Sequence, residues 1–255
     1  MFGLWIWTLP ERGKRQRAVE IKEQTVLHTR FCCAYVLRGP RTPEAVLRRR
    51  AAAAARRLQK AGVRSVVLPE GFPYGPLLEK RKMGPVDTLP LRRELAAEQV
   101  RRELEDRDLP AGRAAVSADA MSPELVRTVT ELALRSRYVL LDVPHGGPEL
   151  AARLRREYGV ALQLSPDRAQ LSQAEALVLF APRTDLHRDN PVVVEAYQGA
   201  GTALPPLLLP PALERQLPGG CSRVQLLAAL RDSGALRPGQ ISLVRSGNGG
   251  NGLDA

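Results

Sequence analysis

Short apolar runs alternate with amphipathic helical patterns between residues 113 and 181, and this alternation constrains the fold more than any other feature of the chain. Each pair of parallel strands needs a crossover, and strands covered by helices on both faces are apolar throughout. We therefore predict an α/β fold with a mostly parallel, Rossmann-like sheet between two layers of helices, preceded by a small basic α/β unit. The predicted strands of the sheet are Arg113–Ser117, Tyr138–Val143, Val160–Leu164 and Ala176–Phe180.

Helix-start signals follow these strands directly. Helices often begin with a capping residue, then proline, then an acidic residue. The capping residue accepts hydrogen bonds from free backbone N–H groups of the first turn, proline has no N–H group that needs a partner, and the acid is attracted to the positive end of the helix dipole. The pattern occurs three times in the main sheet, at Ser122-Pro123-Glu124, Gly147-Pro148-Glu149 and Ser165-Pro166-Asp167. Its position after three successive strands indicates repeated βα units.

Four segments make up the expected domain organisation. Residues 1–68 form a basic amino-terminal α/β unit, and residues 69–112 form a Pro/Gly-rich connection that includes a charged surface helix. Residues 113–245 form the main α/β unit, and the glycine-rich residues 246–255 form a flexible tail. A chain of 255 residues is long enough for one large domain or two small ones.

The amino-terminal unit begins with the apolar run Met1–Leu9. We predict an edge strand there, and an interfacial anchor rich in Trp is the alternative. Residues 18–39 are rich in β-branched and aromatic types and are predicted to be β structure. Thr42-Pro43-Glu44 opens a predicted helix, which Gly62 ends, and Val63–Leu68 is the next predicted strand.

Positive charge is concentrated at the amino-terminal end. The formal net charge is +11, and residues 1–60 hold 14 lysines and arginines but 4 acidic residues. This predicts that the region 12–60 contacts an acidic partner or nucleic acid, and a solvated arginine-rich face is the alternative. No zinc-finger, helix-turn-helix or RNP pattern supports the contact. The candidate residues on the predicted helix are Arg48, Arg49, Arg56 and Arg57.

Three cysteines, Cys32, Cys33 and Cys221, form no CxxC or Cys/His metal spacing. The absence of a disulfide framework is typical of a reducing compartment. No apolar run reaches the roughly 20 residues that a transmembrane helix needs. The prediction is therefore a cytoplasmic protein without a transmembrane segment. Cys221 precedes a predicted helix, so a reactive thiol is one further possibility.

The loop after the strand at Tyr138–Val143 is the candidate ligand site. Two glycines would let a ligand approach the backbone, and an acid and an imidazole would supply polar groups. The arrangement is similar to a Rossmann-type fingerprint, but it lacks GxGxxG, and Pro148 removes one N–H group that a phosphate needs. A plain tight turn is the alternative. The candidate ligand-binding residues are Asp142, His145, Gly146, Gly147 and Asp167.

A weaker metal hypothesis rests on Asp185, His187 and Asp189, which alternate along a predicted loop. Alternate residues of an extended segment share one side, so they could ligate a divalent ion. The flanking Arg183 and Arg188 disfavour a cation there. No Walker P-loop or GxSxG elbow is present.

Two functions remain open from the sequence. The chain is a small anionic ligand- or nucleotide-binding α/β protein that uses the loop 142–148, or a non-catalytic interaction protein that uses its basic region. The residues specify no cofactor, and they leave open whether any catalysis occurs.

Overall fold

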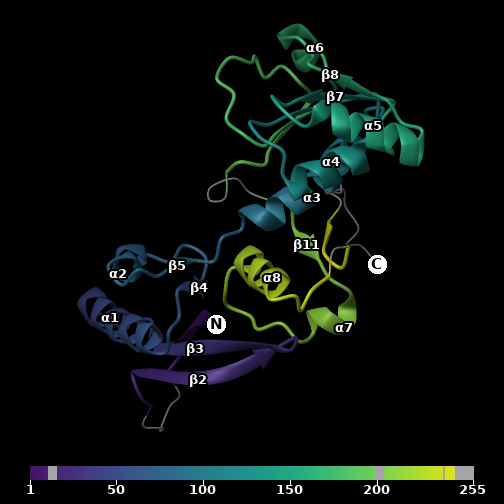
Figure 1. Ribbon diagram of the computed structural model, residues 1–255. Coiled ribbons are helices and arrows are strands. Elements are labelled where there is room, and N and C mark those ends of the chain that lie inside the picture. The colour runs from purple at the N-terminus through teal and green to yellow at the C-terminus, as the bar shows by residue number, and fades with distance from the viewer. Residues whose placement is uncertain (11–15, 199–203, 238, 245–255) are drawn as a thin grey trace, which may run out of the picture. The chain divides into compact units, whose positions relative to one another are not determined.

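The computed structural model describes residues 1–10, 16–198, 204–237 and 239–244. Two sheets, one all parallel and one mostly parallel, are covered by helices, which confirms the predicted α/β class (Figure 1). The chain divides into unit 1, which comprises Met1–Thr88 and Leu209–Ile241, and unit 2, which comprises Leu89–Leu208 and, among the described residues, 242–244. The expected tail at 246–255 lies outside the described residues.

Sheet B of unit 2 consists of parallel strands in the order β10-β9-β6-β7-β8. Along the chain, the first strand of sheet B is its middle strand, β6. The next two strands, β7 and β8, lie on one side of β6, and the last two, β9 and β10, lie on its other side. The strand order therefore reverses between β6 and β9, and in open α/β sheets ligands bind outside the carboxyl ends at such a point. The strands are β6 (Arg113–Ser117), β7 (Tyr138–Asp142), β8 (Leu162–Leu164), β9 (Ala176–Leu179) and β10 (Val192–Glu195).

Helices cover both faces of sheet B. On one face, α3 (Leu89–Asp106), α4 (Pro123–Ala133) and α5 (Gly147–Tyr158) pack against alternate strand residues that include Val116 and Leu141. On the other face, Leu171 of the short helix α6 (Arg168–Ser172) packs against Leu140, Leu177 and other residues of opposite parity. Apolar side chains on both sides of each strand explain why these strands are continuous apolar runs in the sequence.

The prediction of a charged surface helix at Leu91–Leu104 was wrong in one respect. The segment is helical as α3, but it is a core helix, because Leu91, Leu95, Val100 and Leu104 are buried. The many charged residues of α3 lie on the rest of its surface and make its apolar stripe hard to recognise in the sequence. The sequence pattern alone therefore underestimated how deeply the helix is buried.

Sheet A of unit 1 has the order β2-β3-β1-β4-β5, in which β2 and β3 form an antiparallel hairpin and the other pairs are parallel. The prediction that the chain starts with an edge strand was wrong. β1 pairs with β3 on one side and β4 on the other, and Leu4 and Trp5 are fully buried on opposite faces. The strands are β1 (Phe2–Thr8), β2 (Val19–Val26), β3 (Thr29–Leu37), β4 (Ser65–Val67) and β5 (Gly84–Pro85).

Residues from both ends of the chain build unit 1. Helix α1 (Glu44–Lys60) packs its alanine-rich stripe onto one face of sheet A. At the carboxyl end of β4, the Leu68 N–H donates to Gln225 Oε1 over 2.9 Å, and the Ser222 N–H donates to the Leu68 carbonyl over 2.7 Å. These bonds hold α8 (Arg223–Asp232) in unit 1. The other helices of the unit are α2 (Gly75–Glu79) and α7 (Pro211–Glu214).

This division differs from the expected boundaries. Residues 209–241 were assigned to the main unit at 113–245, and α3 was assigned to the connection at 69–112, but they belong to unit 1 and unit 2 respectively. An amphipathic helix can cover either sheet, so its periodicity does not say which one it joins. The two-residue strands β11 (Leu207–Leu208) and β12 (Ser242–Leu243) pair antiparallel in unit 2. No helix in the described ranges is long and apolar enough to cross a membrane.

Candidate functional site

Two neighbouring strands of sheet B end in polar side chains. Ser117, the last residue of β6, lies in register with Asp142, the last residue of β7. Ser117 is 1% exposed, and its hydroxyl donates to Asp142 Oδ2 over 3.1 Å. A hydroxyl and a carboxylate are therefore fixed next to the point where the strand order reverses.

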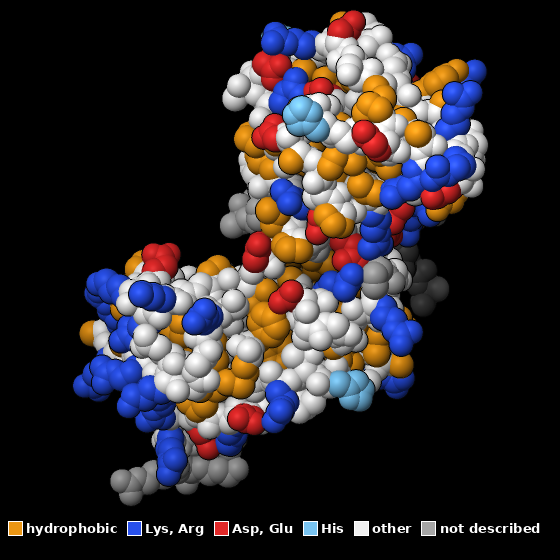
Figure 2. Space-filling view, in the orientation of Figure 1, with side chains coloured by type: hydrophobic (Ala, Val, Ile, Leu, Met, Phe, Trp, Pro, Cys, Tyr) orange, Lys and Arg blue, Asp and Glu red, His pale blue; other side chains and the backbone are white. Residues whose placement is uncertain are grey.

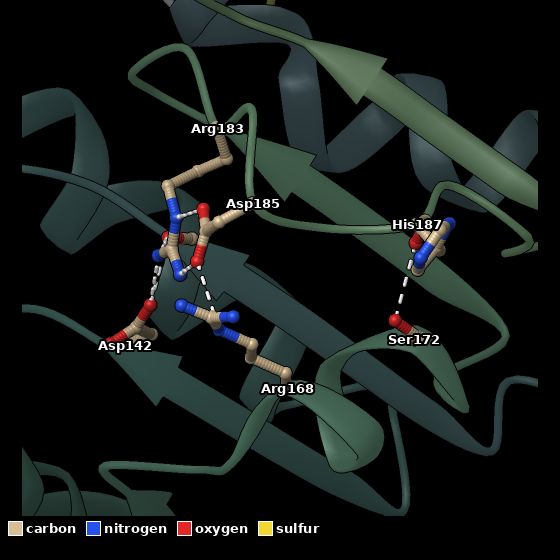
Figure 3. Close-up of polar contacts among 7 residues, drawn as sticks. Asp142, Arg168, Ser172, Arg183, Asp185 and His187 are labelled. Carbon is tan, nitrogen blue, oxygen red and sulfur yellow. Dashed lines mark hydrogen bonds and ion pairs between the residues drawn. The ribbon is translucent and has the colours of Figure 1, made fainter.

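Arg183, which follows the neighbouring strand β9, forms hydrogen bonds with both of these residues. It follows β9 by four residues, and its Nη1 donates to Ser117 Oγ over 2.7 Å and also to Asp142 Oδ2 (Figure 3). Because β9, β6 and β7 are adjacent, the side chain of Arg183 lies across the carboxyl ends of all three strands. One guanidinium thus occupies the position at which a ligand is expected in such a sheet.

The other edge of the same guanidinium binds Asp185. Arg183 Nε donates to Oδ1 over 2.8 Å and Nη2 donates to Oδ2 over 3.0 Å, so the pair is bidentate. Arg168, at the start of α6, adds an ion pair of 3.2 Å to Asp185. The hydrogen bonds that Arg183 donates to Asp185 lower the pKa of Asp185 to about 2, and the same bonds raise the pKa of Arg183. We call Ser117, Asp142, Arg168, Arg183 and Asp185 the arginine cluster.

The loop that carries Arg183 and Asp185 is anchored at two further positions. Ser172 Oγ donates to the carbonyl of His187 over 3.2 Å. The buried Asn190 amide donates to the carbonyls of Leu171 and Ala174, each over 2.8 Å. These contacts fix the second half of the loop, just before β10, to the α6 segment.

The predicted ligand loop has one residue in the arginine cluster. Asp142 belongs to it, whereas His145 is exposed. Gly146 has a left-handed φ of 80° and caps α5, and a Cβ added to it would lie 2.7 Å from Met121 Cγ. Gly147 is buried in the first turn of α5. The backbone conformation and the packing of Met121 account for these glycines without a ligand.

Asp167 serves as the N-cap of α6. Its Oδ1 accepts from the Gln170 N–H over 2.7 Å, and Gln170 Oε1 accepts from the Asp167 N–H over 3.0 Å. This is a capping box, which accounts for the acid at this position. The structure does not link Asp167 with Asp142 or His145 by a hydrogen bond among the described residues.

The structure does not bring Asp185, His187 and Asp189 together as metal ligands. Asp185 is occupied by Arg183 and Arg168, and Figure 3 shows His187 apart from that pair, beside Ser172. Within the described part of the chain, no group of three or more His, Cys, Asp or Glu side chains could hold a metal ion.

Sequence reasoning missed the arrangement around Arg183. It placed Arg183 after a strand and treated it as a cation that disfavours metal binding, and it gave Ser117 and Arg168 no role. The position of Arg183 directly after a buried strand was a usable signal. The strand order was needed to show that this strand lies beside β6 rather than at an edge.

The four arginines predicted to contact a polyanion are exposed on α1. Figure 2 shows Lys and Arg side chains gathered on the surface where Figure 1 places α1. They are not equivalent, because Arg57 Nη1 donates to the Val19 carbonyl over 2.7 Å and therefore also supports the sheet. The other three exposed residues of this basic face are Arg48, Arg49 and Arg56.

The three cysteines behave as packed side chains. Cys32 and Cys33 are buried in the apolar strand β3. Burial raises the pKa of Cys221, which is opposite to the low pKa that a reactive thiol at a helix start would have.

Comparisons with known proteins give no family. No protein-family model matches the chain, and no curated protein matches it. Among solved structures, it is similar to D-lactate dehydrogenase with NAD+ from Lactobacillus jensenii, with 11% identity and a TM-score of 0.28. The similarity covers 59% of this chain and 56% of that one, so this chain spans little more than half the length of the dehydrogenase. The α/β class rests on the sheets of this chain and not on that likeness.

Proposed function

We propose that unit 2 binds a small anionic ligand, a carboxylate or a phosphate ester, at the arginine cluster. The observation that carries the proposal is the position of Arg183, whose guanidinium lies across the ends of β9, β6 and β7. Ligands of open α/β sheets bind at this point, where the strand order reverses. The proposal is for binding, without a catalytic step.

The chemistry of the cluster supports the ligand class. Asp185 takes both Nε and Nη2 of Arg183, which is the geometry in which arginine holds the carboxylate or phosphate of a ligand. Asp185 lies on an exposed loop with 32% of its side chain accessible, so an incoming anion can take its place. Arg168, 73% exposed, supplies a second cation on the solvent side.

Asp142 and Ser117 would recognise a hydroxyl group of the same ligand. Both contact Nη1, the end of the guanidinium that faces away from Asp185. A carboxylate at the end of the second strand of a Rossmann-like sheet is placed to accept from a sugar hydroxyl. A nucleotide, or a hydroxylated organic acid, would satisfy both ends of Arg183. His145 is exposed on the loop that follows Asp142, where its imidazole would donate a hydrogen bond to the bound anion.

The test measures anion binding by isothermal titration calorimetry with citrate, inorganic phosphate, AMP and NAD as probes. Arg183→Gln should abolish binding of any probe that binds the wild-type protein. Asp185→Ala should strengthen binding, because it removes the internal competitor for the guanidinium. Arg156→Gln, an exposed arginine of α5 outside the cluster, is the matched control and should leave binding unchanged.

Two outcomes contradict the proposal. One is that none of the probes binds the wild-type protein or Asp185→Ala. The other is that Asp185→Ala lowers the melting temperature and no probe restores it, which would make the cluster a purely structural ion-pair network. A binding probe whose affinity also falls in His145→Ala would extend the site to the loop 142–148.

A second candidate function is a polyanion contact through α1. Its support is the exposed basic face, which carries Arg48, Arg49 and Arg56 on one helix of unit 1. Such a contact would not read sequence, and its strength would fall steeply with salt. Replacing these three residues with Gln should lower the salt concentration at which heparin releases the protein.

The matched control removes the same charge elsewhere, from Arg153, Arg155 and Arg156 of α5. Equal effects of the two triple variants would show a dependence on net charge alone and would contradict a specific role for α1.

A further inference from the structure

A hollow in unit 1 lies where two strands end and α1 begins. Its volume is about 620 Å³, within the range of roughly 300–1,000 Å³ that small-molecule sites occupy. We propose that it binds a small aromatic anion, that is, a flat apolar ring that carries a carboxylate, sulfate or phosphate group. The residues that line it are Pro10, Gly39, Pro40, Arg41, Thr42, Pro43, Val46 and Arg50.

The hollow lies at the carboxyl edge of sheet A. β1 and β3 are parallel neighbours with Thr8 in register with Leu37, and the Arg38 N–H donates to the Thr8 carbonyl over 2.8 Å. Pro10 and Gly39 therefore follow the two strands side by side, and Pro10 Cγ lies 3.4 Å from where a Cβ on Gly39 would be. The carboxyl edge of a parallel sheet is where ligands bind in α/β proteins.

The walls of the hollow favour a ring. Pro10, Pro40 and Pro43 present flat, rigid apolar surfaces, and Val46 of α1 adds a branched side chain. Proline rings and aromatic rings stack in many recognition sites, with little conformational entropy lost because proline is already rigid. Thr42 is turned toward the loop backbone, since its Oγ1 accepts from the Gly39 N–H over 2.9 Å.

The charge of the hollow selects an anion. Arg41 and Arg50 line it, and none of the described residues that line it is acidic. Arg50 has a fixed orientation, because its Nη1 donates to the Leu37 carbonyl over 2.5 Å. Its guanidinium is therefore held in place, while Arg41 is exposed and can turn toward a bound carboxylate. A cation with the same ring would be repelled.

The experiment titrates the full chain with 2-naphthoate and, separately, with 2-naphthylmethylamine, which has the same ring with a positive charge. The wild-type protein should bind 2-naphthoate saturably and should not bind the amine. Arg183→Gln, in which the arginine cluster no longer takes a carboxylate, should keep one saturable naphthoate site. Arg41→Gln should weaken naphthoate binding about two- to fivefold, the effect of losing one exposed ion pair. Arg64→Gln, an exposed arginine of unit 1 outside the hollow, should leave it unchanged.

A second variant tests the ring contact. Val46→Asp places a carboxylate in the hollow and should abolish naphthoate binding, while circular dichroism checks that the variant is folded. Arg183→Gln separates this site from the arginine cluster of unit 2. Absence of saturable binding, equal binding of the amine, equal losses in Arg41→Gln and Arg64→Gln, or a loss confined to Arg183→Gln would each overturn the proposal.

Discussion

The guanidinium of Arg183 donates to the hydroxyl of Ser117 over 2.7 Å, and this bond fixes the loop after β9 to the last residue of β6. The two residues are far apart in sequence, but the return of the chain to the middle of sheet B makes their strands neighbours. The Ser117 hydroxyl is buried, so this contact belongs to the stability of the sheet as well as to the proposed site.

Replacing Arg183 should therefore destabilise unit 2. Arg183→Gln leaves a buried hydroxyl and the Asp142 carboxylate without their charged donor, and we expect a loss of about 1–3 kcal/mol in local stability. Hydrogen exchange of the amides in β6 and β7 measures this loss. Replacing the exposed Arg156 with Gln should change the local stability measured at the same amides by less than about 0.5 kcal/mol. An equal effect of both variants would contradict a stabilising role for the hydrogen bond between Arg183 and Ser117.

The stability that Asp185 contributes should depend on pH. The pKa of Asp185 is lowered to about 2 in the folded state by the hydrogen bonds from Arg183, whereas an unfolded aspartate titrates near 3.9. The pair therefore stabilises the fold above about pH 4, and this stabilisation is lost as the pH falls from there toward 2.

The melting temperature difference between wild type and Asp185→Asn should thus be larger at pH 6 than at pH 2.5. The exposed Asp119→Asn serves as the control. A carboxyl NMR titration of Asp185 with its midpoint near 4 would contradict the expectation.

Gly146→Ala should destabilise unit 2 by about 1–3 kcal/mol for two separate reasons. The φ of 80° strains a residue with a Cβ, and that Cβ would lie 2.7 Å from Met121 Cγ. Gly159 shares the left-handed conformation but has open space around it, so Gly159→Ala isolates the strain. Met121→Ala in the Gly146→Ala background should recover the part of the stability loss that comes from the contact between the new Cβ and Met121. A double-mutant cycle measured by urea denaturation tests this.

Leu140→Ala should cost about 2–5 kcal/mol, the usual loss for truncating a buried leucine. Leu140 is 1% exposed in β7, which is paired on both edges. Tyr138→Ala in the same strand is the control, because Tyr138 is 53% exposed. A Leu140→Ala protein with unchanged urea midpoint would show that this strand is not part of the core.

The candidate site could be predicted only in part. The sequence pointed to Asp142 as a candidate ligand-binding residue and to Asp185 as a weak candidate metal ligand, and both bind Arg183 instead. It could not assign the glycines at 146 and 147, because their role depends on Met121, which comes from the preceding βα loop. It could not find the hollow in unit 1, because that hollow needs β1 and β3 to lie side by side.

The sequence by itself determined the elements of this protein. Apolar runs, capping residues and helical stripes are local signals, and they located β6, β7, β8 and β9 of sheet B and the helices α4, α5 and α6, because strand and helix periodicity are properties of neighbouring residues. Tertiary structure alone decided which elements are neighbours: that β1 is central, that α3 is buried, that α8 joins unit 1, and that Arg183 reaches Ser117. Any apolar face can be buried against several others, so the choice among partners depends on the packing of the whole chain and not on any local pattern.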